Sequence, residues 1–468
     1  MKSLLRFCAI LFVTLAKINT ASATHAAGMD LSYECVGNNQ YLFYATFYRD
    51  CIGIDAPFVL PIDISSASCG YNQTFSASLV YSTQGSDTIS HLAGLCPDLN
   101  SQCTGGNYTG YEQYIYAVTV TLPFACNDWI IGTHESARNV AITNLADPGN
   151  YDLYVECHMD NTNSLCNNSP VFSTIPLAYS CTNQIFVYNH GAFDPDGDSL
   201  VYTLVNPLDT LNGPIPYSNG SFSPTYPLTT STGTFDFDPV TGQMSCTPSA
   251  NQIAVISVRI DEYRNGNKIG STQRDLQMVV KTCNNNVPEI PLGIENLVGG
   301  SLISNNTVVV CPGATVDFDL VGVDLDASNV LSMTTNLATT IPGAVFGTSG
   351  TNPITGHLTW NTSVGDSGFY VFTVTISDDG CPISGQQVYS YTIQVSKPAV
   401  DAGPDLAICN SNPVVQLSVT GQDPYIWNNA AYLDNNSSAT PTATLPDTGT
   451  YMFVVTGNAG GFCQANDT

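Results

Sequence analysis

Basic residues are scarce in this 468-residue chain, which contains 11 Lys and Arg against 38 Asp and Glu and has a formal net charge of −27. Nucleic acid and anionic lipid are poor partners for such a surface, because both are negatively charged. After the N-terminal segment no stretch reaches about 18 consecutive apolar residues, so no transmembrane segment is predicted. The acidic composition is consistent with divalent-cation binding and equally with simple solubility.

Motifs of the common enzyme classes are also missing. The chain has no G-x-S-x-G, no glycine-rich phosphate loop and no C-x-x-C, and His134-Glu135 lacks a second His four residues later. Cys157 and His158 are adjacent on an expected strand, so their side chains face opposite sides, whereas a Cys–His catalytic couple requires contact. We therefore expect a non-enzymatic protein without catalytic residues. Paired carboxylates of the glycosidase type remain the alternative.

The N-terminus has the pattern of a secretory signal peptide. Lys2 and Arg6 precede a mostly apolar run at 10–15, and Ala21-Ser22-Ala23 offers a cleavage site. We predict a signal peptide at 1–23 and an exported protein. The remaining chain has 15 of the 16 cysteines, so it is expected to form disulfides with at least one cysteine unpaired.

Two copies of a D-x-G-x-Y pattern lie in the second half of the chain, at 366–370 and 447–451. Each precedes alternating apolar residues, at 371–375 and 452–456. The pattern is typical of the tyrosine corner of immunoglobulin-like β-sandwiches, in which the tyrosine hydroxyl bonds back to the backbone. Phe372 and Phe453 stand two residues after the tyrosines, so packing is expected to replace a central disulfide. Two corners one domain apart predict tandem sandwiches.

The predicted fold class is all-β, with tandem Ig-like or cadherin-like β-sandwich modules behind a disulfide-rich β-sandwich domain. Abundant Gly, Pro, Asn, Ser and Thr support it. An Asp-rich loop followed by a Thr-Gly turn occurs twice, at 194–198 with 241–242 and at 324–326 with 355–356. The expected domains are a disulfide-rich β domain, a cadherin/Ig-like sandwich, an Ig-like repeat and a PKD/Ig-like sandwich that is short enough to be truncated, at 24–171, 172–283, 284–397 and 398–468.

Cysteine pairing does not follow from spacing, but three pairs are close enough to consider. The considered pairs are Cys96 with Cys103, Cys311 with Cys381, and Cys409 with Cys463.

The best candidate metal site is the Asp194-Pro195-Asp196-Gly197-Asp198 loop. Ca²⁺ takes six to eight oxygen ligands, and alternating Asp on a glycine-turned loop can supply several of them. We expect Asp194, Asp196 and Asp198 as ligands, with Asp261 or Glu262 added from a distant strand, Asp261 being the residue we select. The alternative is an Asp-rich turn that binds its own backbone. A weaker equivalent consists of Asp324 and Asp326 with Asp378 and Asp379.

Five of the eight basic residues after the signal lie between 259 and 281. In so acidic a chain they are expected to pair with carboxylates, and Arg264 and Arg274 are the candidates for pinning neighbouring strands. Aromatic residues are dense in 24–171. Tyr114 and Tyr116 share one face of a strand and are either core residues, which we favour, or a platform for sugars.

The chain resembles a family of large exported surface proteins of Bacteroidetes that contain repeated Ig, cadherin-like and PKD-like modules and are associated with gliding motility and type IX secretion. The strings that carry the resemblance are Tyr33-Glu34-Cys35, Tyr48-Arg49-Asp50-Cys51, Asn167-Asn168-Ser169-Pro170-Val171-Phe172, the 194–202 stretch, Glu262-Tyr263-Arg264-Asn265-Gly266 and Asp401-Ala402-Gly403-Pro404-Asp405. The sorting domain usual in that family is not seen in 400–468. The resemblance implies display at the cell surface and a role in adhesion.

The sequence therefore predicts a secreted or cell-surface adhesin-like or scaffold protein, a non-catalytic modular stalk stiffened by Ca²⁺. The alternative is an array of carbohydrate-binding modules in a polysaccharide-processing system. Expected partners are other cell-surface proteins or extracellular glycans, with self-association as a further option.

Overall fold

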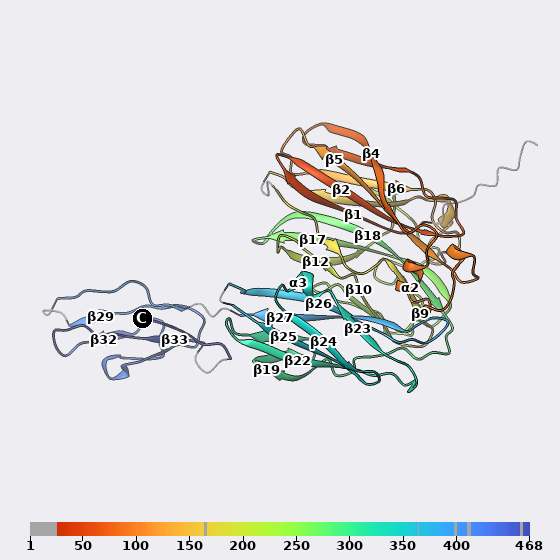
Figure 1. Ribbon diagram of the computed structural model, residues 1–468. Helices are drawn as coiled ribbons and strands as arrows, with labels where there is room; N and C mark the ends of the chain where they lie inside the picture. The colour runs from red at the N-terminus through yellow and green to blue at the C-terminus, as the bar shows by residue number, and fades with distance from the viewer. Residues whose placement is uncertain (1–25, 163–165, 364, 397–399, 410–412, 459–461) are drawn as a thin grey trace, which may run out of the picture. The chain divides into compact units, whose positions relative to one another are not determined.

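The computed structural model describes residues 26–468 except 163–165, 364, 397–399, 410–412 and 459–461. The predicted signal peptide at 1–23 lies outside the described residues. The chain divides into two compact units. Unit 1 contains the residues up to Val287 together with Asp378–Gln387, and unit 2 contains Pro288–Ser377 and Val388–Thr468. Strands make up nearly all of the regular structure (Figure 1), which confirms the predicted all-β class.

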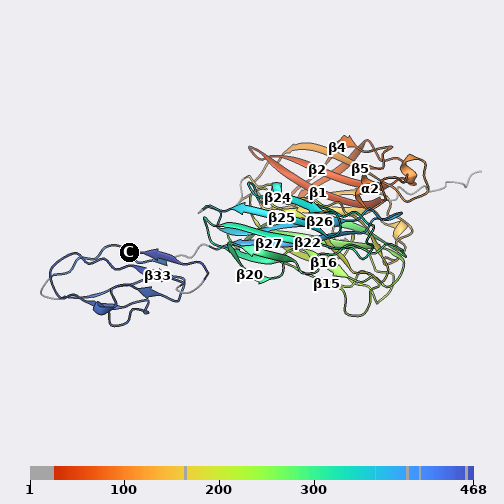
Figure 2. The same ribbon diagram turned by 60° about the horizontal axis from the view of Figure 1, so that its bottom comes forward.

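A closed antiparallel barrel of eight strands forms the main body of unit 1. Each strand pairs with the next, and β7 closes the ring by pairing with β18. Strands β1, β2, β5 and β4 lie side by side in both views (Figures 1 and 2). The order around the ring is β18 (Asn267–Lys281), β1 (Ala26–Gly37), β2 (Gln40–Asp50), β5 (Tyr111–Thr121), β4 (Tyr71–Ser82), β3 (Val59–Ser66), β6 (Trp129–Glu135) and β7 (Leu153–Met159).

Alternation of side chains explains the barrel core. In β2, Tyr41, Phe43, Ala45 and Phe47 are fully buried, while the residues between them are partly exposed. The inward rows of neighbouring strands meet these side chains in one large apolar cluster around Trp129. Side chains that alternate along a strand fall on opposite faces of its sheet, so a period of two is enough to fill the barrel interior.

Strands added to β18 enlarge the sheet beyond the barrel. The β17–β18 hairpin turns at Asn265 and Gly266, whose φ values of 53° and 78° suit the two-residue turns that Asn-Gly favours. The parallel strand β9 also pairs with β18. The added strands are β17 (Gln252–Arg264), β12 (Ser199–Val205), β9 (Leu177–Cys181), β13 (Leu208–Thr210) and β14 (Gly213–Pro214).

Smaller elements complete unit 1. They are the sheet of β10 (Phe186–Asn189), β16 (Gln243–Cys246) and β15 (Asp236–Phe237), the pair β8 (Val171–Phe172) and β11 (Ala192–Phe193), the helix α2 (Thr88–Leu92) and the 3₁₀ turns η1 (Gln102–Thr104) and η2 (Pro148–Asn150). The segments 24–171 and 172–283, separated in the sequence interpretation, thus share one sheet and one compact unit, because β18 pairs with both β1 and β7.

Unit 2 contains a two-sheet β-sandwich over Ile294–Val395. Its core lies between the sheets and includes Phe318, Leu358, Phe372 and Ile393, all fully buried. One sheet is β19 (Ile294–Val298), β22 (Thr315–Gly322), β25 (Ile354–Asn361) and β24 (Val345–Gly350); the other is β20 (Gly300–Ser304), β21 (Thr307–Val310), β27 (Gln386–Val395), β26 (Gly368–Ser377) and β23 (Ser332–Thr335), with the helical turn α3 (Leu337–Thr340).

The C-terminal part of unit 2 has short strands around Val419, Tyr425, Trp427 and Val455. Its elements are β28 (Val400–Asp401) with β30 (Thr420–Gly421), β29 (Val414–Gln416) with β32 (Thr442–Thr444), β31 (Ile426–Trp427) with β33 (Val455–Gly457) and β34 (Ala465–Asp467), and the 3₁₀ turn η3 (Ala430–Tyr432). Across the described part of the chain, no helix is long and apolar enough to cross a membrane.

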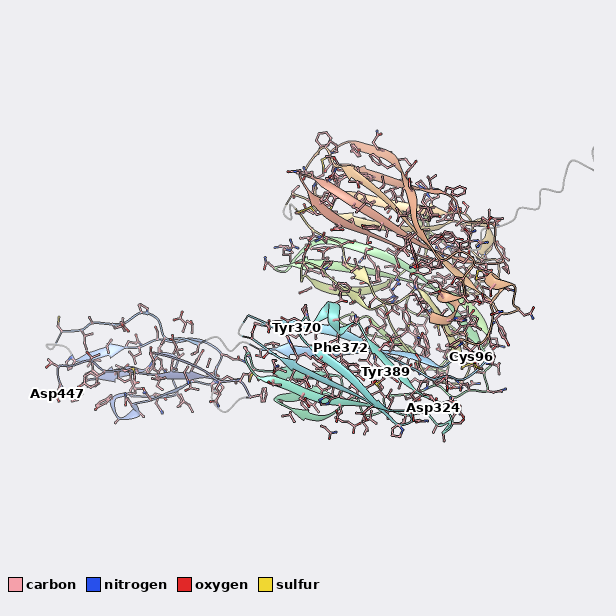
Figure 3. The ribbon with its side chains drawn as sticks, in the orientation of Figure 1. Cys96, Asp324, Tyr370, Phe372, Tyr389 and Asp447 are labelled. Carbon is pink, nitrogen blue, oxygen red and sulfur yellow. A yellow bond between two sulfur atoms is a disulfide. The ribbon has the colours of Figure 1, made fainter. Side chains whose placement is uncertain are left out.

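One of the two predicted tyrosine corners forms as expected. The Tyr451 hydroxyl donates to the Asp447 carbonyl at 3.3 Å. Tyr370 instead packs edge-on against Trp360, with ring centroids 4.9 Å apart. Phe372 (Figure 3) is fully buried and stacks on Tyr391 at 5.8 Å, so aromatic packing does take the place of a central disulfide.

Among the described residues, six disulfides link cysteines that are distant in sequence. They are Cys35–Cys166, Cys51–Cys103, Cys69–Cys126, Cys96–Cys381, Cys181–Cys283 and Cys311–Cys463. All three pairs considered from spacing are therefore wrong. The partners of Cys96 and Cys311 are 285 and 152 residues away, a proximity that only folding creates. Of the described cysteines, Cys157 and Cys246 are buried and unpaired, and Cys409 is exposed and unpaired.

Candidate functional site

The Asp-rich loop of unit 1 is a tight turn between β11 and β12. Asp194 Oδ1 accepts the backbone N–H groups of Asp196 at 2.8 Å and Asp198 at 3.0 Å. Gly197 has φ +83°, a value that favours glycine. The carboxyl oxygens of Asp194, Asp196 and Asp198 come within 4.8 Å of one another. The structure thus brings these three predicted ligands together.

Arg264, at the end of β17, already binds part of this turn. Its Nε donates to Asp198 Oδ1 at 2.8 Å, and its Nη2 lies 3.3 Å from Asp196 Oδ2. The pairing of Ser199 with Tyr263 in the β12–β17 ladder places the turn against this end of β17. Asp196 also accepts the backbone and side-chain N–H groups of Asn168, both at 2.8 Å. The expected pairing of Arg264 with carboxylates is confirmed.

Glu262 lies beside these three aspartates, but it is not among the carboxylates that all lie within 4.8 Å of one another. Its side chain is fully buried, and Oε1 accepts the Asn167 amide at 2.7 Å. Within the described residues, Glu262 Oε2 and Asp194 Oδ2 are buried without a hydrogen-bond partner. Burial, and then the charge of Asp194, raise the pKa of Glu262 well above its ordinary value. Burial, opposed by the two backbone N–H groups, raises the pKa of Asp194 to about 6. We call Asp194, Asp196, Asp198 and Glu262 the acidic cluster.

Asp261 is not part of the acidic cluster. Its carboxylate binds Arg259 at 2.9 Å and Lys268 at 2.6 Å. Adjacent residues of a strand face opposite sides, so only one of Asp261 and Glu262 can point toward the turn. The structure gives that position to Glu262, the residue that was named with Asp261 but not selected.

The second acidic candidate is not assembled as one group. Asp324 Oδ1 accepts the Asp326 N–H at 2.7 Å within its own turn in unit 2. Asp378 belongs to unit 1, where it accepts the N–H groups of Gly380 at 2.8 Å and Gly385 at 2.9 Å. These contacts are those of self-bonding turns.

Three further arginines are buried in unit 1, each against a carboxylate. Arg274 Nε lies 2.6 Å from Asp30, which confirms its expected pairing, and Arg138 lies 2.6 Å from Asp275. Arg49 binds Glu112. The partners of these pairs span strands distant in sequence, so the few basic side chains of the chain stabilise the barrel.

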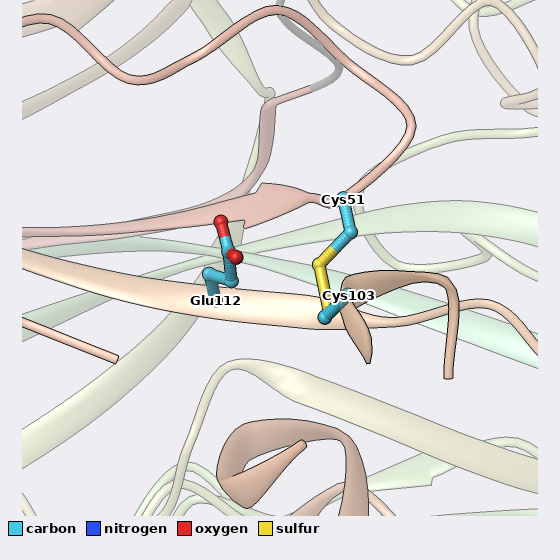
Figure 4. Close-up of side chains that lie close together, drawn as sticks. All are labelled: Cys51, Cys103 and Glu112. Carbon is cyan, nitrogen blue, oxygen red and sulfur yellow. A yellow bond between two sulfur atoms is a disulfide. The ribbon is translucent and has the colours of Figure 1, made fainter. Parts of the chain in front are cut away.

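Glu112 also lies near Cys51 and Cys103 (Figure 4), in an arrangement with the spacing of a metal site. The two sulfurs are joined in a disulfide, and Glu112 holds Arg49 and accepts the Tyr114 hydroxyl at 2.7 Å. A disulfide sulfur is not a thiolate, and thiolate is the form that binds metals. This cluster is therefore structural.

A cavity of about 340 Å³ with both polar and apolar walls lies on the outer face of the barrel. Its lining includes Asp63, His134, Asp152 and Tyr154, with His134 Nδ1 4.0 Å from Asp63. Gly132 makes room for the Tyr154 ring, since a Cβ there would lie 2.2 Å from the tyrosine hydroxyl. No local pattern in the sequence indicates this cavity, because its lining residues come from strands that only the folded barrel brings together.

Many aromatic residues of the first region are core residues, although Phe58, Tyr81 and Phe124 are exposed. Tyr114 and Tyr116 are 2% and 0% exposed, so they offer no sugar platform and the favoured core interpretation is confirmed. The opposite orientation of Cys157 and His158 is confirmed as well. The Cys157 thiol lies 3.1 Å from the Leu31 carbonyl in the interior, while His158 binds Glu156 at 2.9 Å and is partly exposed.

Comparisons with known proteins give only distant likenesses. No protein-family model and no curated protein matches the chain. Among solved structures, the N-terminal eight Ig domains of Down Syndrome Cell Adhesion Molecule align at 7% identity and a TM-score of 0.24, over 91% of this chain and 46% of that one. The mouse nectin-like molecule 4 ectodomain aligns at 13% identity and a TM-score of 0.21, over 62% of this chain and 94% of that one. An endo-fucoidan hydrolase of glycoside hydrolase family 107 aligns at 14% identity and a TM-score of 0.16, over 68% of this chain and 39% of that one. At TM-scores this low, we draw no conclusion about fold family or function from these similarities.

Proposed function

We propose that this protein is an exported, non-catalytic scaffold of adhesin type that holds partners at the cell surface and keeps its length under tension. The observation that carries the proposal is the connectivity of its disulfides. Cys96–Cys381 anchors the segment Asp378–Gln387, which connects β26 to β27 in the chain and belongs to unit 1. Cys311–Cys463 links the sandwich of unit 2 to the C-terminal part of the same unit. Such links resist extension covalently.

The same disulfides produce a short covalent route through the chain. From Ala26 the route passes through Cys35–Cys166, Cys181–Cys283 and Cys311–Cys463 to Thr468. Its peptide segments are 26–35, 166–181, 283–311 and 463–468, about 57 residue steps, which at about 3.6 Å each reach roughly 220 Å with the bridges. A pull on the two ends loads this route and leaves most of the fold unloaded.

Disulfides persist in oxidising compartments, which supports export. The acidic surface disfavours nucleic acid and anionic membranes, so the proposed partners are other surface proteins or extracellular glycans. Self-association is a further option that sedimentation of the purified chain can test.

The test is made on the cells that produce the protein. Surface biotinylation of intact cells should label the chain, and deleting it should lower the shear force at which cells detach. Complementation with the chain should restore attachment, whereas a Cys311→Ser/Cys463→Ser form should restore it less at high shear than at low shear. An intracellular location, or attachment unchanged by deletion, would contradict the proposal.

A second candidate function, carbohydrate binding, has one observation in its favour. The cavity around Asp63 and His134 combines carboxylate and imidazole groups with apolar walls from Ile130 and Leu211, a mixture suited to a sugar ring. A glycan array probed with the wild type and with an Asp63→Asn/His134→Ala variant tests it. Binding that both forms show equally would exclude this cavity as the site.

A further inference from the structure

We propose that the acidic cluster binds a divalent cation of the calcium type, held between the 194–198 turn and Glu262 of β17. Glu262 Oε2 and Asp194 Oδ2 are the two carboxyl oxygens of the cluster that the described protein atoms leave without a partner. The site differs from the sequence prediction in its strand ligand, because Asp261 is bound to Arg259 and Lys268. The inference extends the scaffold proposal to a specific ion.

The acidic cluster has more carboxyl groups than basic side chains, which favours the binding of a cation. Of the four carboxyl groups, two bind the one guanidinium of the site, because Arg264 donates to both oxygens of Asp198 and to one oxygen of Asp196. The charge of Arg264 also acts on Glu262, while Asp194 Oδ1 is bonded to backbone N–H groups of its own turn. A buried carboxylate without a partner is destabilising, and either a proton or a bound cation can neutralise it.

A simple Asp-rich turn does not account for these groups. In such a turn one carboxyl oxygen binds the following backbone N–H groups, as Asp194 Oδ1 does. The other oxygen is then free to face water, but Asp194 Oδ2 is buried. Glu262 is on a strand 64 residues beyond Asp198 and has no part in the turn, yet it is fully buried beside it.

The donor chemistry selects calcium over other metals. The cluster offers carboxylate oxygens. The side-chain carbonyl oxygen of Asn167 is nearby and accepts a hydrogen bond from Arg264 Nη2 at 2.7 Å. It contains no Cys or His, the ligands that zinc and copper favour. Ca²⁺ accepts irregular sets of oxygen ligands from loops, whereas Mg²⁺ demands a nearly ideal octahedron. The 194–198 turn and the strand position of Glu262 form such an irregular set.

Binding would connect three separate stretches of unit 1. Asn167 and Asn168 already bond to Glu262 and Asp196, and Arg264 bonds to the turn. A cation between Asp194 and Glu262 would close this network and hold the β11–β12 turn on the β17–β18 hairpin.

The experiment titrates CaCl₂ into the full exported chain, with its disulfides intact and other metals removed by chelator. Isothermal titration calorimetry should show one site that a similar concentration of Mg²⁺ does not block. Glu262→Gln keeps the shape of the side chain and the acceptor for Asn167, and it should weaken binding by about ten-fold or more. Asp261→Asn is the matched control, with the same loss of charge at the adjacent position, and should bind like the wild type.

Asp194→Asn is the second variant, because it keeps the turn's acceptor while removing the charge, and it should also weaken binding. Folding of each variant is checked by its melting temperature in chelator. The proposal is overturned by no Ca²⁺ binding at millimolar concentration, by wild-type affinity in Glu262→Gln, or by equal losses in Glu262→Gln and Asp261→Asn. Such results would leave the adhesion proposal standing, since that is judged on cells by shear.

Discussion

The disulfide connectivity predicts how far the chain can be pulled. With handles at residue 26 and Thr468, the oxidised protein should not extend beyond about 220 Å, because the route through three disulfides contains only about 57 residue steps. After reduction the same handles bracket 442 residue steps, which corresponds to about 1,600 Å at roughly 3.6 Å per residue. The difference of about 1,400 Å is far larger than the resolution of single-molecule force spectroscopy.

A variant without the Cys311–Cys463 bridge refines the test. In Cys311→Ser/Cys463→Ser the shortest remaining route uses Cys51–Cys103 and Cys96–Cys381. It comprises 26–51, 96–103 and 381–468, about 119 residue steps, so the limit should rise to about 440 Å. Cys409→Ser is the control, because Cys409 is exposed and forms no bridge, and it should leave the limit unchanged.

Optical-trap or atomic-force measurements of contour length decide the matter. An oxidised wild-type chain that extends by several hundred ångströms beyond the predicted limit would refute the reasoning. An unchanged limit in the double serine variant would refute it as well.

Other predictions concern stability. Arg274→Leu leaves Asp30 buried without its cation, so chemical denaturation should show a loss of about 3–5 kcal/mol. Burial raises the pKa of Glu135 from 4.5 to about 7, so its ionisation destabilises the fold as pH rises through that window. Glu135→Gln should therefore gain about 1–2 kcal/mol above pH 7, allowing for screening, and nothing at pH 4, as melting across pH will show. Tyr425→Phe, which removes a 2.6 Å bond, should cost about 1 kcal/mol in denaturant titration, more than Tyr451→Phe, whose bond is 3.3 Å.

Local patterns in the sequence were sufficient for much of the fold. Alternation predicted the strands and the burial of Tyr114 and Tyr116, and the spacing of Asp447 and Tyr451 predicted a corner that forms. These features depend on residues a few positions apart. At the other copy of the pattern, Tyr370 packs edge-on against Trp360.

Features that depend on contacts between residues distant in the chain could not be predicted from the sequence. The pairing of β1 with β18 joins Met29 to Asp275, and nothing in either segment specifies the other. Cysteine pairs were missed for the same reason. At the candidate site, alternation requires Asp261 and Glu262 to face opposite sides, but the choice of face depends on the register of β17 with its neighbours.

The closure of the barrel by β18 has a consequence for how the chain folds. Strands β1 and β7 each keep an unpaired edge until residues 267–281 arrive, so the first 160 residues to emerge cannot complete their sheet alone. A nascent or translocating chain must remain protected until more than half of its length is available. Truncated chains that end near residue 171 should therefore aggregate through their unpaired strand edges.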